Sequence, residues 1–497
     1  MREYVRLLQG LNSLFAKNQV HVPPLSLLFP ALAAPVLPFL RLAPYPYSTR
    51  FFRMISGTDF HLLESPAPLS ASHPGLATMS RSNVRTRIPR RMRRRTVSAI
   101  DLGTTKICAL VGRMDEFGGI QLLGMGQVPS NGFKRGMVAD IDQAVGSISA
   151  ALEMAEEQSG TRITEVYAGI AGGHISCVNS SAMVEVRNPM RGVTASEKAR
   201  VLERCKQVAI PEDREIVHVI PQEFICDDQG GVKNPIGMSC TRLEAKVHLV
   251  TAAVASAQNI VRCLHRSGVR TVDILFESLA SSLAILREDE KELGVLLLDI
   301  GGGTTDVALF QGGAVRFTGV VPFGGNSITS DIAHAFRISR LDAEMLKHTS
   351  GCCLPGGVGD GETIEVHALL SGTAMVESRR FLAEVIEARC LEILEGAMEL
   401  LTRAGHASAF TAGVVLTGGS SQIEGLDALA ADVFGCEVRL GTPQRLGDHM
   451  EALANPAYAT AQGLLLYGLG HETRAASRPV FLGRFYQDFM RMIDWYS

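Results

Sequence analysis

Two stretches of the chain combine glycine, threonine and aspartate in a spacing that suits the binding of a phosphate chain. Residues 97–111 read VSAIDLGTTKICALV, and residues 295–310 read VLLLDIGGGTTDVALF. In each, an apolar run ends at an aspartate, a glycine–threonine turn follows, and a second apolar run completes a predicted strand–turn–strand unit. Turns without Cβ atoms let backbone N–H groups approach an anion, and threonine hydroxyls add donors. Asp101 and Asp299 stand where a carboxylate can hold hydrated Mg²⁺ against phosphate oxygens.

The repetition of this unit is more informative than either copy, because a single glycine-rich hairpin is also a common turn that binds nothing. Two copies about 200 residues apart predict a duplicated α/β fold whose halves hold one phosphate chain from both sides. A third stretch, residues 414–426 (VVLTGGSSQIEGL), predicts a strand that runs into Gly418, Gly419 and Ser420, with a helix beginning near Ile423.

These stretches, in this order, resemble the actin-like ATPase superfamily, which includes actin, heat-shock chaperones, sugar kinases and bacterial filament proteins. The two hairpins are similar to its phosphate motifs, and residues 414–426 are similar to its adenosine motif. Residues 276–286 (FESLASSLAIL) and 455–465 (NPAYATAQGLL) resemble its two connecting helices. The resemblance implies an α/β fold of two ribonuclease-H-like halves, with ATP and Mg²⁺ bound between them.

The resemblance also implies roles for individual residues. Asp101 and Asp299 are expected to bind Mg²⁺ through water, and Glu277 takes the place of the residue that positions the attacking water. Relatives usually have proline after this glutamate; here Ser278 follows it, which implies at most a slow ATPase. The residues expected to hold the nucleotide are Gly103, Thr104, Thr105, Lys106, Gly301, Gly302, Gly303, Thr304, Thr305, Gly324, Gly325, Asn326, Glu344, Lys347, Gly418, Gly419 and Ser420.

Glu344 and Lys347 lie three residues apart on one face of a predicted helix. In relatives, a Glu–x–x–Lys pair in this helix contacts the ribose and the adenine. Spacing alone fits a surface ion pair, worth a few tenths of a kcal/mol, equally well.

Residues 175–256 interrupt the first half with a strand and helix pattern of their own. An insertion at this place departs from actin and the chaperones, and it resembles the FtsA family of bacterial division proteins. The strings EVRNP (185–189) and HVIPQEF (218–224) carry the same resemblance. The predicted elements of the insertion are short strands over 181–186, 216–219 and 246–252 and a helix over 196–208 that is N-capped near Thr194.

The domain organisation combines these predictions. Residues 140–158 of the first half predict a helix that begins at an aspartate and ends at Gly160. The expected parts are a basic, proline-rich extension (1–96), the first half (97–174 and 257–294), a small inserted α+β domain (175–256), the second half (295–323 and 411–470, the latter also closing the first half), a largely helical accessory subdomain (324–410), a polar linker (471–479) and an amphipathic helix (480–497).

Charge and proline are distributed unevenly along the chain. Residues 1–96 carry a net charge of +11 and 11 of the 21 prolines, whereas the rest carries −14. The acidic body argues against nucleic acid as a partner. Prolines this dense predict a disordered tail and not a membrane span or signal peptide. Since the resembled families begin just before the first phosphate strand, Met54, Met79 and Met92 are candidate starts. The ten scattered cysteines favour a reduced, cytosolic protein.

Residues 480–496 read VFLGRFYQDFMRMIDWY and follow a polar linker. Their apolar and aromatic residues fall on one helical stripe, which predicts a helix lying in a membrane interface. A helix docked on its own body or on a partner is the alternative. The residues expected to enter the membrane are Phe481, Leu482, Phe485, Phe489, Met492, Ile493 and Trp495.

The resemblance implies an ATP-binding protein that polymerises and tethers the division-ring protein FtsZ to the cytoplasmic face of the plasma membrane at the division site. In this family the accessory subdomain receives the C-terminal peptide of FtsZ, and the inserted domain contacts later division proteins. Two other classes stay open. A small-molecule kinase of the same fold would use Asp306 as a catalytic aspartate, although no sugar-binding segment is evident. A pilus-assembly adaptor would have less need of the tail helix.

Overall fold

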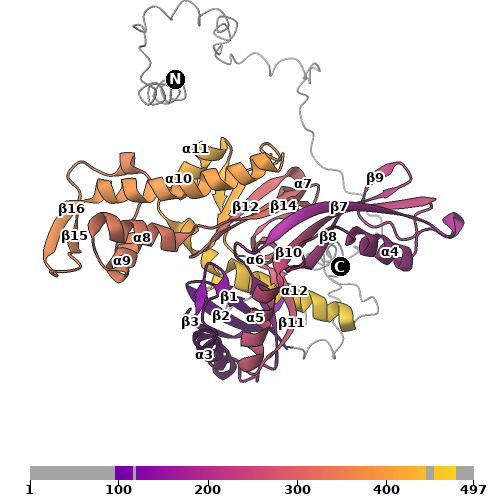
Figure 1. Cartoon of the computed structure of the whole chain (residues 1–497), viewed down its shortest axis with the longest axis horizontal. Coiled ribbons are helices and arrows are strands. Elements are labelled where there is room, and N and C mark those ends of the chain that lie inside the picture. The colour runs from indigo at the N-terminus through magenta and orange to yellow at the C-terminus, as the bar shows by residue number, and fades with distance from the viewer. Residues whose placement is uncertain (1–95, 116–118, 444–452, 477–497) are drawn as a thin grey trace, which may run out of the picture. The chain divides into compact units, whose positions relative to one another are not determined.

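The computed structural model describes residues 96–115, 119–443 and 453–476, which belong to one compact unit (Figure 1). The extension and the helix predicted over 480–497 therefore lie outside the described residues. Among the helices that are described, none combines the length and the apolar character needed to cross a bilayer.

The first half is built on a five-stranded sheet in the order β11-β6-β1-β2-β3. Strands β1, β2 and β3 form an antiparallel meander, and β6 and β11 extend the sheet in parallel beyond β1. The strands are β1 (Thr96–Leu102), β2 (Lys106–Met114), β3 (Ile120–Pro129), β6 (Glu165–Ile170) and β11 (Arg270–Phe276).

The second half repeats this arrangement with the order β14-β13-β12-β17-β18. Its first three strands are again an antiparallel meander, and the other two are again parallel to the first. This repetition confirms the predicted duplication. The strands are β12 (Val295–Ile300), β13 (Thr305–Gln311), β14 (Ala314–Val321), β17 (Val414–Thr417) and β18 (Val438–Leu440).

Two helices connect the halves at the centre of the molecule. Helix α6 (Glu277–Ile285) and helix α12 (Ala459–Ala476) pack against each other. Their backbones touch, because a Cβ atom added at Gly463 would lie 1.8 Å from the carbonyl oxygen of Ala280. Substituting Gly463 would therefore move one connecting helix relative to the other.

The predicted helix of the first half forms as α3 (Ile141–Ser159). The Asp140 side chain accepts a hydrogen bond from the Gln143 N–H at the N-terminus, and Gly160 ends the helix in the left-handed conformation. The remaining elements of this half are β4 (Phe133–Lys134), β5 (Met137–Val138), α5 (Val254–Arg266) and α7 (Glu288–Leu293).

The inserted domain is a sheet in the order β7-β10-β8-β9 with one helix, α4 (Ala195–Cys205). Thr194 and Glu197 form a capping box at the start of α4, as the sequence suggested, but the helix ends three residues before the predicted Val208. The predicted strands were too short, because β10 pairs along its whole length with a neighbour on each side. The strands are β7 (Ser176–Glu185), β8 (Arg214–Cys226), β9 (Gln229–Val232) and β10 (Arg242–Ala253).

The accessory subdomain of the second half is more mixed than predicted, since a β-hairpin interrupts its helices. The hairpin is formed by β15 (Thr363–His367) and β16 (Ala374–Ser378), and Ile364 and Val366 bury its inner face. Its helices are α8 (Gly325–Phe336), α9 (Arg340–Ser350) and α10 (Arg379–Arg403).

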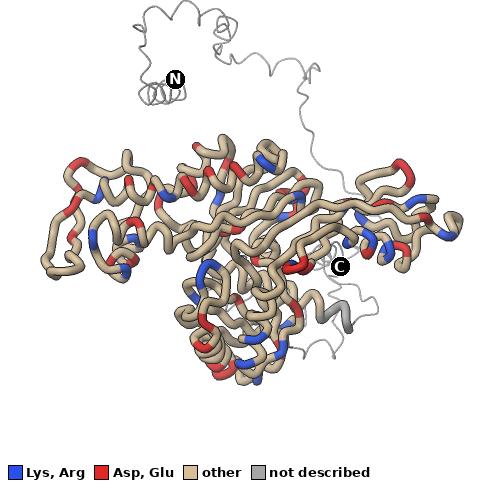
Figure 2. The backbone as a smooth tube through the Cα atoms, viewed as in Figure 1, with Lys and Arg blue, Asp and Glu red and all other residues tan. Residues whose placement is uncertain are grey.

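The strand over Val414–Thr417 leads into a 3₁₀ turn (Gly419–Gln422) before helix α11 (Leu426–Phe434) begins. The helix therefore starts three residues later than predicted. Short 3₁₀ turns also occur at Pro189–Arg191, Pro355–Gly357 and Pro456–Tyr458. Figure 2 shows charged residues mainly on the outer helices and on the inserted domain, with few on the central strands.

Candidate functional site

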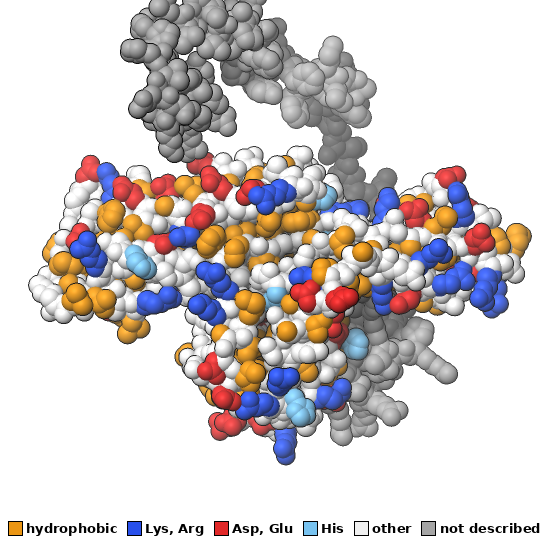
Figure 3. Space-filling view, viewed as in Figure 1, with side chains coloured by type: hydrophobic (Ala, Val, Ile, Leu, Met, Phe, Trp, Pro, Cys, Tyr) orange, Lys and Arg blue, Asp and Glu red, His pale blue; other side chains and the backbone are white. Residues whose placement is uncertain are grey.

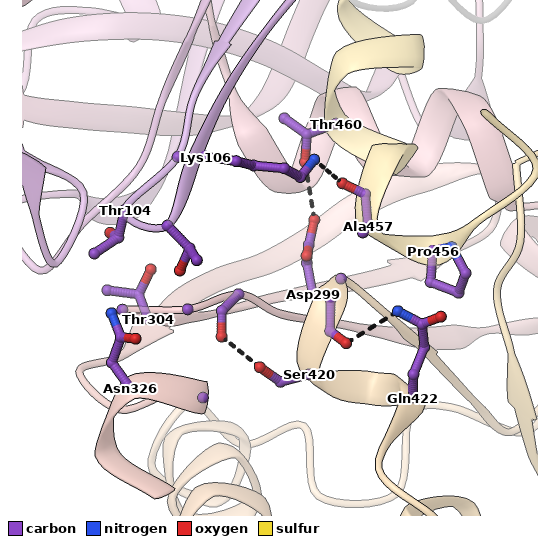
Figure 4. Close-up of a pocket in the computed structure, with 18 of the residues that line it drawn as sticks. Thr104, Lys106, Asp299, Thr304, Asn326, Ser420, Gln422, Pro456, Ala457 and Thr460 are labelled. Atoms are coloured by element: carbon purple, nitrogen blue, oxygen red, sulfur yellow. Dashed lines mark hydrogen bonds between the residues drawn. The ribbon is translucent and has the colours of Figure 1, made fainter. Parts of the chain in front are cut away.

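A cavity of about 560 Å³ lies between the two glycine–threonine hairpins (Figure 4). Segments from both halves and both connecting helices contribute to its wall. The predicted site residues that line it are Asp101, Gly103, Thr104, Thr105, Lys106, Glu277, Asp299, Gly301, Gly302, Gly303, Thr304, Gly325, Asn326, Glu344, Lys347, Gly418, Gly419 and Ser420.

Two predicted residues, Thr305 and Gly324, are not among the lining residues. Thr305 is fully buried, and its hydroxyl donates to the carbonyl oxygen of Phe323 at 2.9 Å. Gly324 packs against the turn of the second hairpin, since an added Cβ would lie 2.6 Å from the carbonyl oxygen of Gly301. Both residues therefore pack against the residues that line the cavity without lining it themselves.

The turns of the two hairpins meet directly. A Cβ atom added at Gly302 would lie 1.8 Å from Oγ1 of Thr105, and one at Gly303 would lie 2.5 Å from Oγ1 of Thr104. Only glycine allows this approach, because any side chain would push the two halves apart. The hydroxyls of both threonines are thereby brought against the opposite turn.

The N-terminus of α8 is attached to the second turn by its own backbone. The N–H of Gly325 donates to the Gly301 carbonyl at 3.0 Å, and the N–H of Asn326 donates to the Gly302 carbonyl at 2.7 Å. From the other side, the Ser420 hydroxyl donates to the Gly301 carbonyl at 3.0 Å. The N-terminus of α8 and the segment at Ser420, both predicted to contact the nucleotide, are therefore connected through the turn of the second hairpin.

Lys106 reaches from the first hairpin to the second connecting segment. Its Nζ donates to the carbonyl oxygen of Ala457 and lies 4.3 Å from the centre of the Tyr458 ring (Figure 4). The ammonium group therefore extends from the first hairpin along the wall of the cavity to the segment before α12.

Six carboxyl side chains line this cavity, and four of them, those of Asp101, Glu277, Asp299 and Asp306, lie close enough to affect one another. Burial raises the pKa of Asp101 to about 6, with nearby Lys106 opposing and Asp299 adding to the rise. Burial and repulsion among these groups raise the pKa of Glu277 and of Asp306 well above their usual values. Burial also raises the pKa of Asp299, although hydrogen bonds from Ser281 and Thr460 oppose it. The cavity thus concentrates negative charge that is poorly compensated.

Asp299 is held by both connecting helices. It accepts hydrogen bonds from the Ser281 hydroxyl of α6 and, at 3.2 Å, from the Thr460 hydroxyl of α12. Sequence reasoning did not select Thr460 as a site residue, and it considered Asp306 only as the catalytic aspartate of a small-molecule kinase. Both residues lie in the stretches described above, but their place in the cavity depends on how distant segments pack.

The position of Glu277 is set by a glycine on the neighbouring strand. Glu277 is the first residue of α6, and an added Cβ at Gly169 of β6 would lie 2.9 Å from its Oε1. The absence of a side chain at Gly169 therefore leaves room for this carboxyl group at the cavity wall.

Glu344 and Lys347 form the predicted pair, and the pair is not an ordinary surface bridge. Lys347 Nζ lies 2.8 Å from both carboxylate oxygens of Glu344 and donates to Thr329 Oγ1 at 3.0 Å. Lys347 is only 9% exposed, and both residues line the cavity. Hydrogen bonds from Lys347 and Thr329 overcome the effect of burial and lower the pKa of Glu344.

The carboxyl groups of the cavity are donors of the kind that a hydrated divalent cation takes. Within the described residues, the buried Oδ1 of Asp306 has no hydrogen-bond partner, and a nearby cation would relieve the repulsion among the four acids. In the same part of the chain, no group of three or more His, Cys, Asp or Glu side chains is arranged to hold a metal ion. The donors therefore suit Mg²⁺ that keeps several waters.

Comparison with known proteins shows the family to which the described fold belongs. The family model described as "Cell division protein FtsA" matches residues 296–463, and that described as "SHS2 domain inserted in FTSA" matches residues 172–251. Among solved structures, the PilM-PilN type IV pilus biogenesis complex shares the fold with a TM-score of 0.55 and 18% identity, covering 75% of this chain and 98% of that one.

Curated relatives match over most of their length. The cell division protein FtsA of Pseudomonas aeruginosa is 43% identical over 384 residues, which are 77% of this chain and 92% of that protein. The cell division protein FtsA of Escherichia coli K12 is 41% identical over 382 residues, which are 76% of this chain and 90% of that protein. The chain therefore belongs to the cell division protein FtsA family and has its actin-like ATPase fold, with an SHS2 domain inserted in the first half.

Proposed function

We propose that the cavity binds ATP together with Mg²⁺ and that nucleotide occupancy controls assembly of this division protein into filaments. The observation that carries the proposal is the meeting of two matched hairpins over four interacting carboxyl groups, three of which are buried. The turns present backbone N–H groups and hydroxyls to phosphate oxygens. Asp101 and Asp299 hold the hydrated cation, which neutralises charge on the phosphates.

The same site favours binding over rapid turnover. Burial and the neighbouring carboxyl groups raise the pKa of Glu277 well above its usual value, which disfavours the charged form that would accept a proton from water. The hydroxyl of Ser278, buried behind it, has no hydrogen-bond partner within the described residues. We therefore infer at most a slow ATPase.

Calorimetry of ATP binding tests the nucleotide site. Asp299→Ala should weaken binding in the presence of Mg²⁺ by about tenfold or more, since it removes a buried charge from the cation's surroundings. In EDTA the parent and the variant should differ much less. Asp432→Ala, at an exposed position of α11, is the matched control. Equal affinity of Asp299→Ala and the parent in Mg²⁺ would reject the site.

The accessory subdomain is the proposed binding place of the FtsZ C-terminal peptide. It exposes apolar side chains on α9 and around the β15–β16 hairpin, and Figure 3 shows hydrophobic groups on this end of the molecule. Apolar residues exposed in one region are typical of a contact surface. These side chains are Leu341, Met345, Leu369, Leu370 and Val376.

The inserted domain is the proposed contact for later division proteins. Its 3₁₀ turn Pro189–Arg191 exposes Met190 by 92%, and the exposed Arg187 and Arg191 flank it. An apolar residue surrounded by cations suits an acidic partner with an apolar anchor.

The tail 480–497 is the proposed membrane anchor, which would place the protein at the cytoplasmic face of the plasma membrane at the division site. Flotation with liposomes should recover the full chain and lose a form that ends at residue 479. When FtsZ is added, it should float with the vesicles in the presence of the full chain but not in the presence of the shortened form. Equal flotation of both forms would reject the tail as the membrane anchor. Flotation of the full chain without FtsZ would reject the proposed tethering of FtsZ.

A further inference from the structure

A histidine of the inserted domain contacts the residue that precedes Glu277 of the cavity. Strand β11 lies at the edge of the first-half sheet, so N–H groups on its outer side have no strand to pair with. The last of these belongs to Phe276, and it donates to Nε2 of His218 at 3.0 Å. His218 lies on β8, and it belongs to the HVIPQEF string of residues 218–224.

This hydrogen bond requires a neutral imidazole. Because Nε2 accepts, the ring carries its proton on Nδ1. Burial lowers the pKa of His218 to about 4, although Asp273 acts in the opposite direction. Asp273 itself accepts from the Tyr467 hydroxyl at 2.7 Å and from the Ile274 N–H at 2.8 Å. The acceptor on His218 is therefore available at neutral pH.

The residue that His218 holds is the N-cap of α6, and Glu277 follows it. In the described part of the chain, no side chain of α6 itself caps this helix. Phe276 is fully buried, and the Glu277 carboxyl group packs against Gly169, where an added Cβ would lie 2.9 Å from its Oε1. The hydrogen bond from Phe276 to His218 therefore fixes the backbone from which Glu277 projects.

The strand that carries His218 continues into the inserted domain. Four residues further along β8, the side chain of Gln222 donates to the carbonyl oxygen of Val315 on β14 of the second half, at 2.9 Å. One strand thus contacts the first half beside Glu277 and the second half at β14. A displacement of the inserted domain would therefore lengthen or break both hydrogen bonds.

We propose that His218 is a positioning residue for Glu277 and that the inserted domain acts on nucleotide hydrolysis through it. The inference rests on the proposed function, because it needs ATP in the cavity. A partner that binds the inserted domain would change the rate of the chemical step and leave ATP affinity unaltered.

Single-turnover hydrolysis of Mg·ATP by the full chain tests this. His218→Ala should lower the rate by about ten- to hundredfold, the usual effect of a small displacement near the chemistry, with ATP affinity within about twofold of the parent. His218→Gln, whose amide oxygen can accept where Nε2 did, should restore most of the rate. His265→Ala, an exposed histidine of α5, is the control, and Glu277→Gln gives the baseline.

Hydrogen exchange gives a second measurement that does not depend on turnover. The amide of Phe276 should exchange faster in His218→Ala and return toward the parent in His218→Gln. If the alanine variant does not fold, His218→Asn, whose acceptor reaches less far, replaces it.

Three results would overturn the inference: an unchanged rate in His218→Ala, an equal loss in the glutamine variant, or a parent no faster than Glu277→Gln. In all three, intact ATP binding would leave the proposed nucleotide site standing. A parent that fails to bind ATP would instead reject the proposed function itself.

Discussion

At the scale of single residues, the turns of the two glycine–threonine hairpins can touch because glycines stand at the contact. Gly302 and Gly303 bring one turn against the threonines of the other, so that hydroxyls and backbone N–H groups from both halves face one space. The threonines supply donors, but the glycines decide how closely the halves approach.

Replacing Gly302 with alanine should hold the two turns apart. The added Cβ would lie 1.8 Å from Thr105 Oγ1, so the backbone must shift. Overpacking of this kind costs about 1–3 kcal/mol. Because ATP binding needs the two turns in contact, the same cost would fall on binding and lower the ATP affinity by about 5- to 150-fold. Gly146→Ala is the control, because Gly146 lies in α3 away from the cavity and its Cβ would meet nothing within 4 Å. Similar ATP affinities in the two variants, measured by calorimetry, would contradict this account.

Most residues of the cavity were predictable from sequence because they lie in short motifs whose local geometry is nearly fixed by glycine and threonine. Glu344 and Lys347 were ambiguous, since their spacing describes a surface pair and a cavity pair equally well. Thr460 was missed for a related reason. Its hydroxyl matters only because α12 packs beside Asp299, and nothing local in the sequence reports that contact.

At the scale of elements, helix α7 shows how a short segment is held between two halves. Glu290 accepts hydrogen bonds from Arg439 of β18, two of them at 2.8 Å, and from the backbone and side chain of Arg287. Arg439 also donates to the Ile285 carbonyl at the end of α6, at 3.0 Å. One carboxylate therefore joins α7 and the edge strand of the second half, and Arg439 connects both to α6.

Glu290 should make the stability of the protein depend on acid. Burial alone would raise the pKa of Glu290, but the bonds from Arg439 and Arg287 outweigh it and lower the pKa to about 2. Its contribution is therefore complete above the ordinary value of 4.5 and is lost as the pH falls through about 2. Glu290→Gln should cost about 1–3 kcal/mol at pH 7 and progressively less below pH 4.5.

Urea unfolding at a series of pH values measures this difference. Glu437→Gln, an exposed position just before β18, serves as the control and should follow the parent throughout. A deficit in Glu290→Gln that stays constant from neutral to acidic pH would show that the carboxylate contributes by packing and not by charge.

The elements were predictable where the local signals were strong. Asp140 and Gly160 bounded α3 correctly, because capping residues act on their own helix. The inserted strands were longer than predicted, since pairing on both sides of β10 extends them through residues of mixed polarity. The β15–β16 hairpin was missed, although Ile364 and Val366 alternate with polar residues, because the helices around it dominated the pattern.

At the scale of the whole molecule, the inserted domain interrupts the first half in sequence but is attached to the second half in space. Besides the contact from Gln222, the thiol of Cys177 donates to the Thr318 carbonyl at 2.8 Å, and His248 lies between Asn179 and Thr318. All these bonds reach β14 or the residues that face it. The interface is polar and largely buried, so its stability depends on complete pairing.

His248 should be the residue on which this interface depends. Its Nδ1–H donates to Asn179 Oδ1 at 2.7 Å, and its Nε2 accepts from the Thr318 hydroxyl at 2.9 Å. Burial lowers the pKa of His248 to about 4, so the neutral ring pairs at both nitrogens. His248→Leu keeps the volume but leaves the Thr318 hydroxyl without this partner, which should cost about 1–3 kcal/mol.

The loss should be local, because the two halves keep their own cores. Hydrogen exchange should show faster amides in β14 and β10 of His248→Leu, while β1 and β12 exchange as in the parent. His367→Leu, at an exposed position of β15, provides the comparison. Uniform loss of protection across all strands would mean that the inserted domain stabilises the entire fold. Unchanged protection in β14 would mean that the histidine does not hold the two parts together.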